Sequence, residues 1–163
     1  MRRIQFFSAL VLFLSLAGCY HTTRPGRIGS AAPDFSVQDS DRKVTLSQFR
    51  GQVVLVNFWA TWCAPCQAEL PSLISLQDRI KPKAMTVLGI SIDVDDDAYH
   101  RFIKQRSVNF PTVRDPEQKV ASVYGTTGWP ETYIVDRNGV LRRKIVGPID
   151  WNSSDINQFL NSL

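Results

Sequence analysis

Two cysteines are the residues best suited to chemistry in this chain. Cys63 and Cys66 lie three residues apart, about one helical turn, so their sulfurs can close a small disulfide ring. Residues 53–58 before them form a nearly continuous apolar, β-branched run, and residues 70–80 after them carry apolar side chains at helical spacing. The pair is therefore expected where a buried strand leads into the N-terminus of a helix.

This position favours a reactive thiolate. The unpaired N–H groups and the dipole of a helix N-terminus stabilise an anion, so a thiol placed there loses its proton more easily. The thiolate is the form of cysteine that reacts. We expect Cys63, the first of the pair, to be the exposed nucleophile, with Cys66 within reach to form a disulfide with it. The favoured interpretation is a dithiol–disulfide exchange centre.

Three other interpretations of the pair have less support. A zinc site needs more ligands, but the only other cysteine is Cys19 and the only histidines are His21 and His100. A purely structural disulfide gains little chain entropy from so short a loop. A peroxidatic cysteine is the third alternative, but peroxiredoxins place threonine three residues before it, and Ala60 stands there before Cys63. No metal and no cofactor are expected.

The residues around the pair resemble a known family. The run Trp-Cys-Ala-Pro-Cys at 62–66, after an apolar strand, is similar to the active-site motif of the thioredoxin superfamily. The flanking residues 32–35, 46–51 and 69–71 resemble the TlpA/ResA/CcmG branch, which consists of bacterial membrane-tethered thiol–disulfide oxidoreductases. The resemblance covers residues 32–163. It implies an α/β thioredoxin-like fold, a central mixed sheet flanked by helices, with an extra N-terminal β-hairpin.

The pattern along the chain predicts the elements of such a fold. Residues 35–37 and 43–45 are expected to form a hairpin around a turn at 39–41. Residues 86–92 read as a second buried strand, parallel to 53–58 because a helix connects the two. The other expected elements are a helix over 98–108, an extended piece at 109–113, a short helix over 116–124, a hairpin of 133–135 with 140–146, and a last helix capped by Ser153 or Ser154.

A second functional stretch covers residues 125–133. The resemblance implies a cis peptide bond between Trp129 and Pro130, with the proline facing the cysteines. The backbone next to Pro130 would then pair with an extended substrate chain. Trp62 and Trp129 are the expected substrate contacts, and Trp129 is larger than the residue that many members carry before this proline.

Two acidic residues are candidates for the redox site. Glu131 directly follows Pro130, as in a CcmG-like Pro-Glu-Thr variant, although a solvent-facing edge residue is an equal alternative. Asp93 follows the strand at 86–92, at the sheet edge where catalytic groups collect, and Asp95 is the alternative to it. A carboxylate near both sulfurs disfavours the thiolate, which makes the dithiol a stronger reductant. The two acids therefore favour a reducing role.

The first residues predict export and lipidation. Arg2 and Arg3 precede an apolar stretch at 6–16, which is short for a membrane span. The following Leu-Ala-Gly-Cys resembles a bacterial lipobox, although an ordinary secretory signal is the alternative. The expected division is a signal peptide at 1–18, a tether at 19–31 that begins with lipidated Cys19, and a catalytic domain at 32–163. That domain would lie on the extracytoplasmic side of an inner or outer bacterial membrane.

Composition limits the class of partner. A length of 163 residues with 44% hydrophobic content suits one globular domain. Removing residues 1–18 takes away Arg2 and Arg3, so 17 basic and 15 acidic side chains remain and the net charge falls from +4 to +2. No block of like charge suggests a nucleic-acid partner.

The resemblance implies particular partners for this protein, and three alternative functions remain open. The implied substrates are disulfide-containing envelope proteins, with apocytochrome c the best-known client class of the branch. The implied electron donor is a membrane thiol reductase, and the membrane itself is contacted through the lipid on Cys19. The rival functions are a thiol oxidase or general redox partner, a peroxidase-like redoxin, and a non-catalytic lipoprotein that binds copper or another protein.

Overall fold

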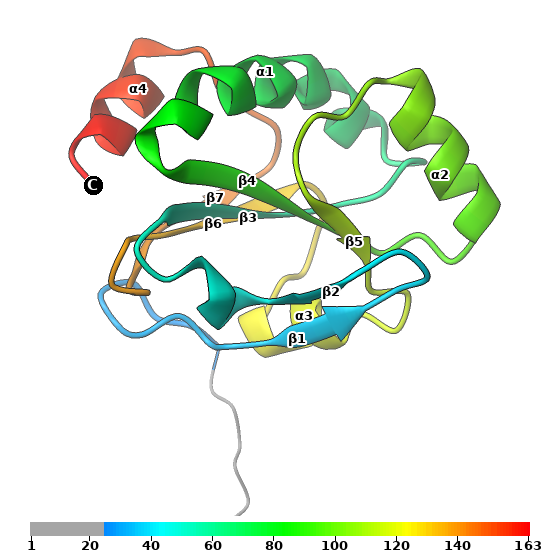
Figure 1. The fold of residues 1–163 in the computed structure, drawn as a ribbon, viewed down its shortest axis with the longest axis horizontal. Coiled ribbons are helices and arrows are strands. Elements are labelled where there is room, and N and C mark those ends of the chain that lie inside the picture. The colour runs from blue at the N-terminus through cyan, green and yellow to red at the C-terminus, as the bar shows by residue number, and fades with distance from the viewer. Residues whose placement is uncertain (1–24) are drawn as a thin grey trace, which may run out of the picture.

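A computed structural model describes residues 25–163 (Figure 1). The predicted signal peptide and Cys19 lie outside the described residues. Five strands form one mixed sheet in the order β5-β4-β3-β6-β7. Their bounds are Val53–Trp59 for β3, Met85–Ser91 for β4, Thr112–Arg114 for β5, Glu131–Val135 for β6 and Leu141–Val146 for β7.

The central strand, β3, is buried along its whole length because both faces of the sheet are covered. It runs parallel to β4 and antiparallel to β6. The helices α1 (Ala64–Ile80), α2 (Asp96–Gln105) and α4 (Ser154–Asn161) lie on one face (Figure 1). The other face carries the hairpin β1–β2 (Ser36–Gln38 and Lys43–Thr45), the 3-10 turn η1 (Leu46–Phe49) and α3 (Lys119–Tyr124). The predicted mixed sheet, flanking helices and extra hairpin are confirmed.

Alternation along β3 separates two apolar cores. Val53 and Leu55 contribute to the core under α1 and α4, which also holds Trp151. Val56 and Phe58 contribute to the core on the hairpin side. Successive side chains of a strand point to opposite faces, so a continuous apolar run is required where both faces are buried.

Several element boundaries differ from the predicted ones. The helix predicted over 116–124 begins only at Lys119, because Gln118 has φ of +55° and a left-handed residue cannot belong to the helix. The helix predicted over 98–108 begins at Asp96, capped by the Asp95 side chain, and ends at Gln105. α1 ends at Ile80, as predicted, and the 3-10 turn η2 (Lys81–Lys83) follows it.

The described part of the predicted tether is paired with the sheet. Gly29 N–H donates to the Leu141 carbonyl at 2.8 Å, Leu141 N–H donates back to Ser30, and Ala31 forms a bridge with Val140. These contacts cover the beginning of the edge strand β7. Among residues 25–163, none of the helices has the length and apolar character needed to cross a bilayer.

Candidate active site

The site is built around a disulfide between Cys63 and Cys66. The S–S distance is 2.10 Å and the two Cα atoms are 5.2 Å apart. Cys63 is the N-cap residue of α1, and its Sγ accepts a hydrogen bond from the Cys66 N–H at 3.2 Å. Pro65 occupies the first turn, where its missing N–H costs nothing. Negative charge on the Cys63 sulfur is therefore stabilised by an N–H group and by the helix dipole.

The two sulfurs are more covered than expected. Cys63 is 6% exposed and Cys66 is 3% exposed, so the prediction of an exposed Cys63 is wrong for this disulfide form. The reason is packing, because the bonded sulfurs shield each other and lie in a small apolar cluster with Trp59, Ala60, Ile92 and Tyr99. Trp62, by contrast, is 63% exposed beside them. An exposed indole next to a nearly covered disulfide offers an apolar contact for another protein.

Residues 129–131 lie at the beginning of β6, next to the cluster that holds the two cysteines. The Trp129–Pro130 peptide bond is cis. The Trp129 side chain packs against the cluster that holds the two cysteines, and its ring centroid is 6.4 Å from that of Phe58. The Pro130 carbonyl accepts a hydrogen bond from Gly147 N–H at 2.9 Å. The proline loop is thus held against the sheet on the side of the disulfide.

Glu131 is buried, with an exposed fraction of 1%, so it is not a solvent-facing edge residue. Its Oε1 is 2.8 Å from the Lys144 Nζ and also accepts a hydrogen bond from the Tyr133 hydroxyl. Burial opposes the charge on Lys144, but the hydrogen bond to Glu131 raises the pKa of the lysine above its ordinary value. The negative charge of Glu131 is therefore balanced locally, which weakens its effect on the sulfurs.

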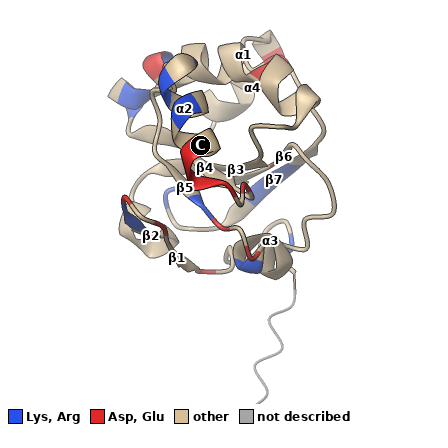
Figure 2. Ribbon diagram, turned by 90° about the vertical axis from the view of Figure 1, so that its right-hand side faces the viewer, with Lys and Arg blue, Asp and Glu red and all other residues tan. Residues whose placement is uncertain are grey.

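Asp93 lies where the sequence placed it, at the carboxyl end of β4 beside the loop that precedes Cys63. It is 3% exposed, and its carboxylate accepts hydrogen bonds from Thr61 and Ser91. Asp95 has another role, since its Oδ1 accepts from Ala98 N–H at 2.9 Å and caps α2. The acidic segment from β4 into α2 is red in Figure 2.

A third acid of the site, Glu69, was not predicted. It lies three residues after Cys66 on α1 and is only 4% exposed. Its Oε1 accepts from Asn57 Nδ2 at 3.1 Å, and its Oε2 accepts from Trp151 Nε1 at 3.3 Å and from Ile149 N–H at 3.4 Å. Burial raises the pKa of Glu69 to about 7, although these hydrogen bonds act in the opposite direction. The signal that could have found it is a charged residue on the apolar face of the helix, beside Leu70 and one turn from Cys66.

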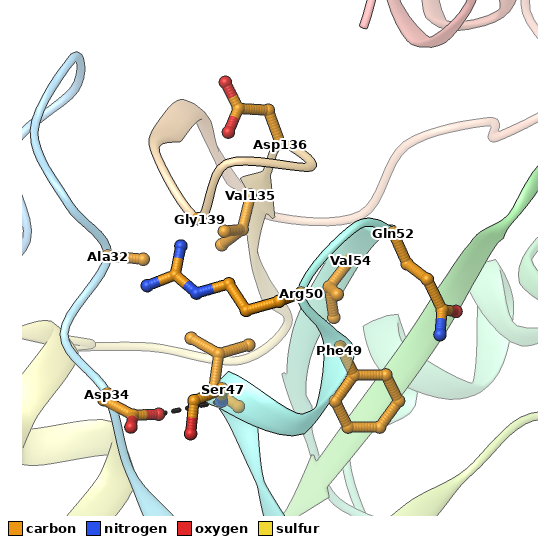
Figure 3. A pocket seen from close by; sticks show the side chains of 11 residues that line it. Ala32, Asp34, Ser47, Phe49, Arg50, Gln52, Val54, Val135, Asp136 and Gly139 are labelled. Atoms are coloured by element: carbon orange, nitrogen blue, oxygen red, sulfur yellow. Dashed lines mark hydrogen bonds between the residues drawn. The ribbon is translucent and has the colours of Figure 1, made fainter.

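Glu69 also borders a hollow. A depression of about 570 Å³ is lined by Ala68, Glu69 and Ser72 of α1 and by residues 148–150. This hollow brings solvent close to the carboxyl group. A smaller hollow of about 290 Å³ lies elsewhere, between η1 and the β6–β7 turn, where the Arg50 side chain crosses it (Figure 3). Neither cysteine lines that second hollow, so it is separate from the redox site.

These features define a class of protein. A disulfide at the N-terminus of the helix that follows the central strand, with a cis proline approaching it from the neighbouring strand, is the site of a thioredoxin-like thiol–disulfide oxidoreductase.

Comparison with known proteins agrees with this class. The chain belongs to the AhpC/TSA family, whose profile matches residues 28–144. It is 32% identical over 145 residues to the thiol-disulfide oxidoreductase ResA of Bacillus thuringiensis strain Al Hakam. This alignment covers 88% of this chain and 84% of the relative. Identity to ResA of Bacillus subtilis is 30% over 134 residues, covering 82% and 74%.

Solved structures show the same fold. The structure described as a thiol:disulfide interchange protein DsbE from Chlorobium tepidum superimposes with a TM-score of 0.78 at 29% identity, covering 84% of this chain and 97% of that one. The predicted thioredoxin-like fold and thiol–disulfide oxidoreductase activity are thereby confirmed.

Proposed function

We propose that this protein reduces disulfides of other proteins on the extracytoplasmic side of a bacterial membrane. The observation that carries the proposal is the Cys63–Cys66 disulfide at the N-cap of α1, with two buried acids close to it in the fold. Glu69 lies one helical turn after Cys66, and Asp93 is hydrogen-bonded to Thr61, two residues before Cys63. Carboxyl groups around a dithiol disfavour its thiolate form and so favour its oxidation, which is the property of a reductant.

The reaction is a two-step exchange. The Cys63 thiolate attacks one sulfur of a substrate disulfide, forming a mixed disulfide and releasing the other substrate sulfur as a thiolate. Cys66 then loses its proton and attacks the Cys63 sulfur, which releases the second substrate thiolate and closes the Cys63–Cys66 bond. Two electrons pass from the protein to the substrate. A thiol donor, which we assign to a membrane thiol reductase, returns the protein to the dithiol state.

Glu69 is the group best suited to accept the proton of Cys66. It lies one turn further along the same helix face, and its pKa of about 7 allows it to take up and release a proton near neutral pH. The hollow beside it gives solvent a route to the carboxyl group. The contact between Glu69 and Asn57 can persist when Glu69 is protonated. The Asn57 side-chain amide then rotates, so that its oxygen accepts a hydrogen bond from the carboxylic acid.

The substrate contacts follow from exposure and position. We assign the first contact to Trp62, and assign to Trp129 and Pro130 the wall of the substrate groove. Apocytochrome c is the client class that the resemblance to the TlpA/ResA/CcmG branch suggests. Membrane attachment through lipid on Cys19, after removal of residues 1–18, completes the proposal.

The deciding experiment compares the protein with C63S and C66S in an insulin disulfide reduction assay and in cell-envelope extracts. We expect C63S to lose turnover and C66S to accumulate mixed disulfides with client proteins. A reduction potential near about −270 mV supports the reductase, whereas one near about −120 mV supports a thiol oxidase. Full turnover by C63S excludes the mechanism. Peroxide consumption or stoichiometric copper binding without insulin reduction identifies one of the other rival functions.

Attachment is tested separately. The C19A protein is expected to leave the membrane fraction while its soluble domain retains insulin reductase activity, because Cys19 takes no part in the exchange. Membrane association that survives C19A rules out lipid on this cysteine as the anchor.

A further inference from the structure

The loop that precedes Cys63 is held through every polar group of one residue, Thr61. Its N–H donates to Asp93 Oδ2 at 2.9 Å, and its hydroxyl donates to Asp93 Oδ1 at 2.6 Å. Its carbonyl accepts from Gln67 Nε2 at 2.5 Å. Thr61 is thus tied to the end of β4 on one side and to the first turns of α1 on the other.

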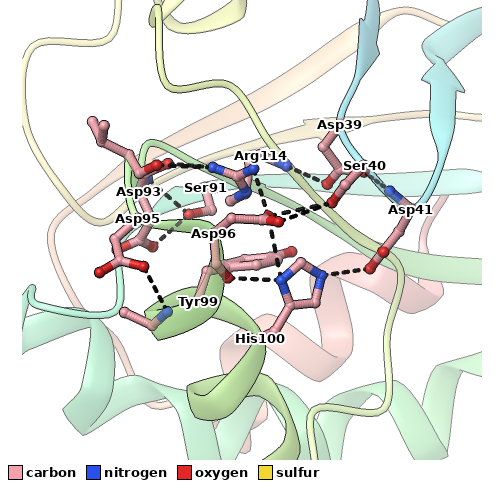
Figure 4. Close-up of polar contacts among 12 residues, drawn as sticks. Asp39, Ser40, Asp41, Ser91, Asp93, Asp95, Asp96, Tyr99, His100 and Arg114 are labelled. Atoms are coloured by element: carbon pink, nitrogen blue, oxygen red, sulfur yellow. Dashed lines mark hydrogen bonds and ion pairs between the residues drawn. The ribbon is translucent and has the colours of Figure 1, made fainter.

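Asp93 is itself fixed in place. Its Oδ2 also accepts from the Ser91 hydroxyl at 2.5 Å, and the Asp93 N–H donates to the same hydroxyl oxygen at 3.0 Å. The Arg114 guanidinium lies 3.4 Å from the Asp93 carbonyl and 3.1 Å from the Val94 carbonyl (Figure 4). The Asp93 carboxylate is therefore a rigid acceptor that receives two hydrogen bonds from Thr61.

Arg114 connects this acceptor to the rest of the fold. Its guanidinium forms an ion pair with Asp96 of α2 at 2.5 Å, and its backbone N–H donates to Asp39 in the hairpin turn at 2.9 Å (Figure 4). The segment that carries Asp93 is consequently joined to β5, α2 and the N-terminal hairpin at one point. Through its hydrogen bonds to Asp93, the loop that precedes Cys63 is therefore linked to β5, α2 and the hairpin.

We propose that Asp93 and Thr61 form a positioning pair that holds Cys63 at the N-cap of α1 when the disulfide is open. The inference deepens the proposed exchange reaction and rests on it. In the disulfide form, the bond to Cys66 fixes the Cys63 sulfur. In the dithiol form that bond is absent, and the sulfur stays aligned with the Cys66 N–H only if the loop before it does not move. Asp93 thus acts on Cys63 through Thr61 and does not itself contact the substrate.

A predicted consequence is a change in thiolate reactivity without a change in fold. Thr61→Val removes the hydroxyl donor and keeps the shape of the side chain, whereas Thr61→Ser keeps the donor and serves as the conservative rescue. Thr86→Val is a matched control, because the Thr86 hydroxyl donates to the Val87 carbonyl within β4, away from the loop that precedes Cys63. The reduced proteins are treated with iodoacetamide at pH values from about 5 to about 9, and thiolate absorbance is followed in parallel.

We expect T61V to be alkylated at neutral pH roughly five- to tenfold more slowly than the unmodified protein, the size expected for loss of one hydrogen bond. A tenfold effect on the thiolate equals a shift of about 30 mV in reduction potential, here to a more negative value. T61S and T86V are expected to retain the unmodified rate and potential. A merely structural role would lower the melting temperature of T61V and leave both quantities unchanged.

Two results overturn the inference. One is a folded T61V protein with the unmodified alkylation rate and potential. The other is a T86V protein that shifts as much as T61V. These measurements need no substrate, so a protein that behaves as expected here but does not reduce insulin contradicts the proposed function alone.

Discussion

Two buried carboxyl groups lie on opposite faces of the sheet, and within residues 25–163 only one of them has a cation beside it. Glu131 begins β6 and points to the face that carries α3, where Lys144 and Tyr133 contact it. Glu69 belongs to α1 on the other face and contacts Asn57, Trp151 and the Ile149 backbone, all of which are neutral donors. β7, which supplies Lys144, is coloured blue along much of its length in Figure 2.

The difference assigns the two acids different roles. Lys144 balances the charge of Glu131 and links it to the edge strand, so this acid strengthens the region behind the cis proline. Glu69 has no such partner in the part of the chain that the structure describes, and burial raises its pKa to about 7. An acid that titrates near neutral pH, one turn from Cys66, suits proton transfer, whereas an acid held by a lysine suits support of the structure.

The largest expected effect comes from removing the cation. Lys144→Met leaves Glu131 buried without its ion partner, which is strongly destabilising for a buried pair. Because the Lys144 side chain is itself 35% exposed, we expect the lower end of that range, a loss of about 3 kcal/mol in the free energy of unfolding. Urea denaturation at about pH 7 measures it.

The matched control for this change is Arg142→Met on the same strand. Arg142 lies 3.6 Å from Asp136 in a pair whose arginine is 49% exposed, so its removal is expected to cost at most about 1 kcal/mol. Equal losses for K144M and R142M would show that Glu131 does not need the lysine. The contrast between the two acids would then not depend on charge compensation.

An effect of at most comparable size, which depends on pH, is expected from Glu69→Gln. The pKa of Glu69 in the folded protein, about 7, lies above its ordinary value of 4.5, so the folded state binds this proton more tightly than the unfolded state. Stability from this group is present below the ordinary value and is lost as pH rises through about 7. Glutamine cannot ionise, so E69Q is expected to be more stable than the unmodified protein at about pH 8, by up to about 3 kcal/mol, and equal to it at about pH 4.

Urea denaturation of E69Q and the unmodified protein across this pH range tests the assignment. Parallel stability curves would contradict a carboxyl group that titrates near neutral pH. If E69Q also slows the resolution of mixed disulfides while leaving iodoacetamide alkylation of Cys63 unchanged, the proton-accepting role of Glu69 is supported as well.

The fold and the reactive pair could be predicted because their signals are local. The apolar run of β3 and the Asn138-Gly139 turn between β6 and β7 each specify an element from a few neighbouring residues. The position of Cys63 at a helix N-terminus follows from the same strand-to-helix pattern. The cis bond at Trp129–Pro130 came from the family resemblance, because no local rule requires it.

The environment of the acids could not be predicted, because it depends on contacts between distant segments. Residues 142–144 are all basic, which is typical of an exposed strand, and only the pairing of Tyr133 with Lys144 across β6 and β7 brings the lysine to Glu131. The burial of Glu69 depends on Trp151, which is 82 residues away in sequence. The covering of Cys63 likewise depends on packing that brings Trp129 and Tyr99 to the same cluster.

The smallest effect is expected at an exposed counterpart of the Lys144–Glu131 pair. His100 Nε2 lies 2.7 Å from Asp41 Oδ2 in the hairpin turn, and Nδ1 lies 2.7 Å from the Asp96 carbonyl oxygen (Figure 4). The hydrogen bond to Asp41, followed by that to the Asp96 carbonyl, raises the pKa of His100 above 6.5. Its stabilising contribution is therefore complete below that value and is lost as pH rises through the higher folded-state pKa.

His100→Gln tests whether burial or pairing sets the size of these effects. The histidine side chain is 37% exposed, so solvent screens the pair and we expect H100Q to lose at most about 1 kcal/mol at about pH 5.5. The difference should disappear at about pH 9, where the histidine is neutral in both states. The unfolding free energies of H100Q and the unmodified protein at the two pH values measure it. H100Q could instead lose as much unfolding free energy at pH 5.5 as K144M does. An ion pair on the surface would then be as strong as one with a buried carboxylate. Burial would no longer explain why Glu131 requires its lysine.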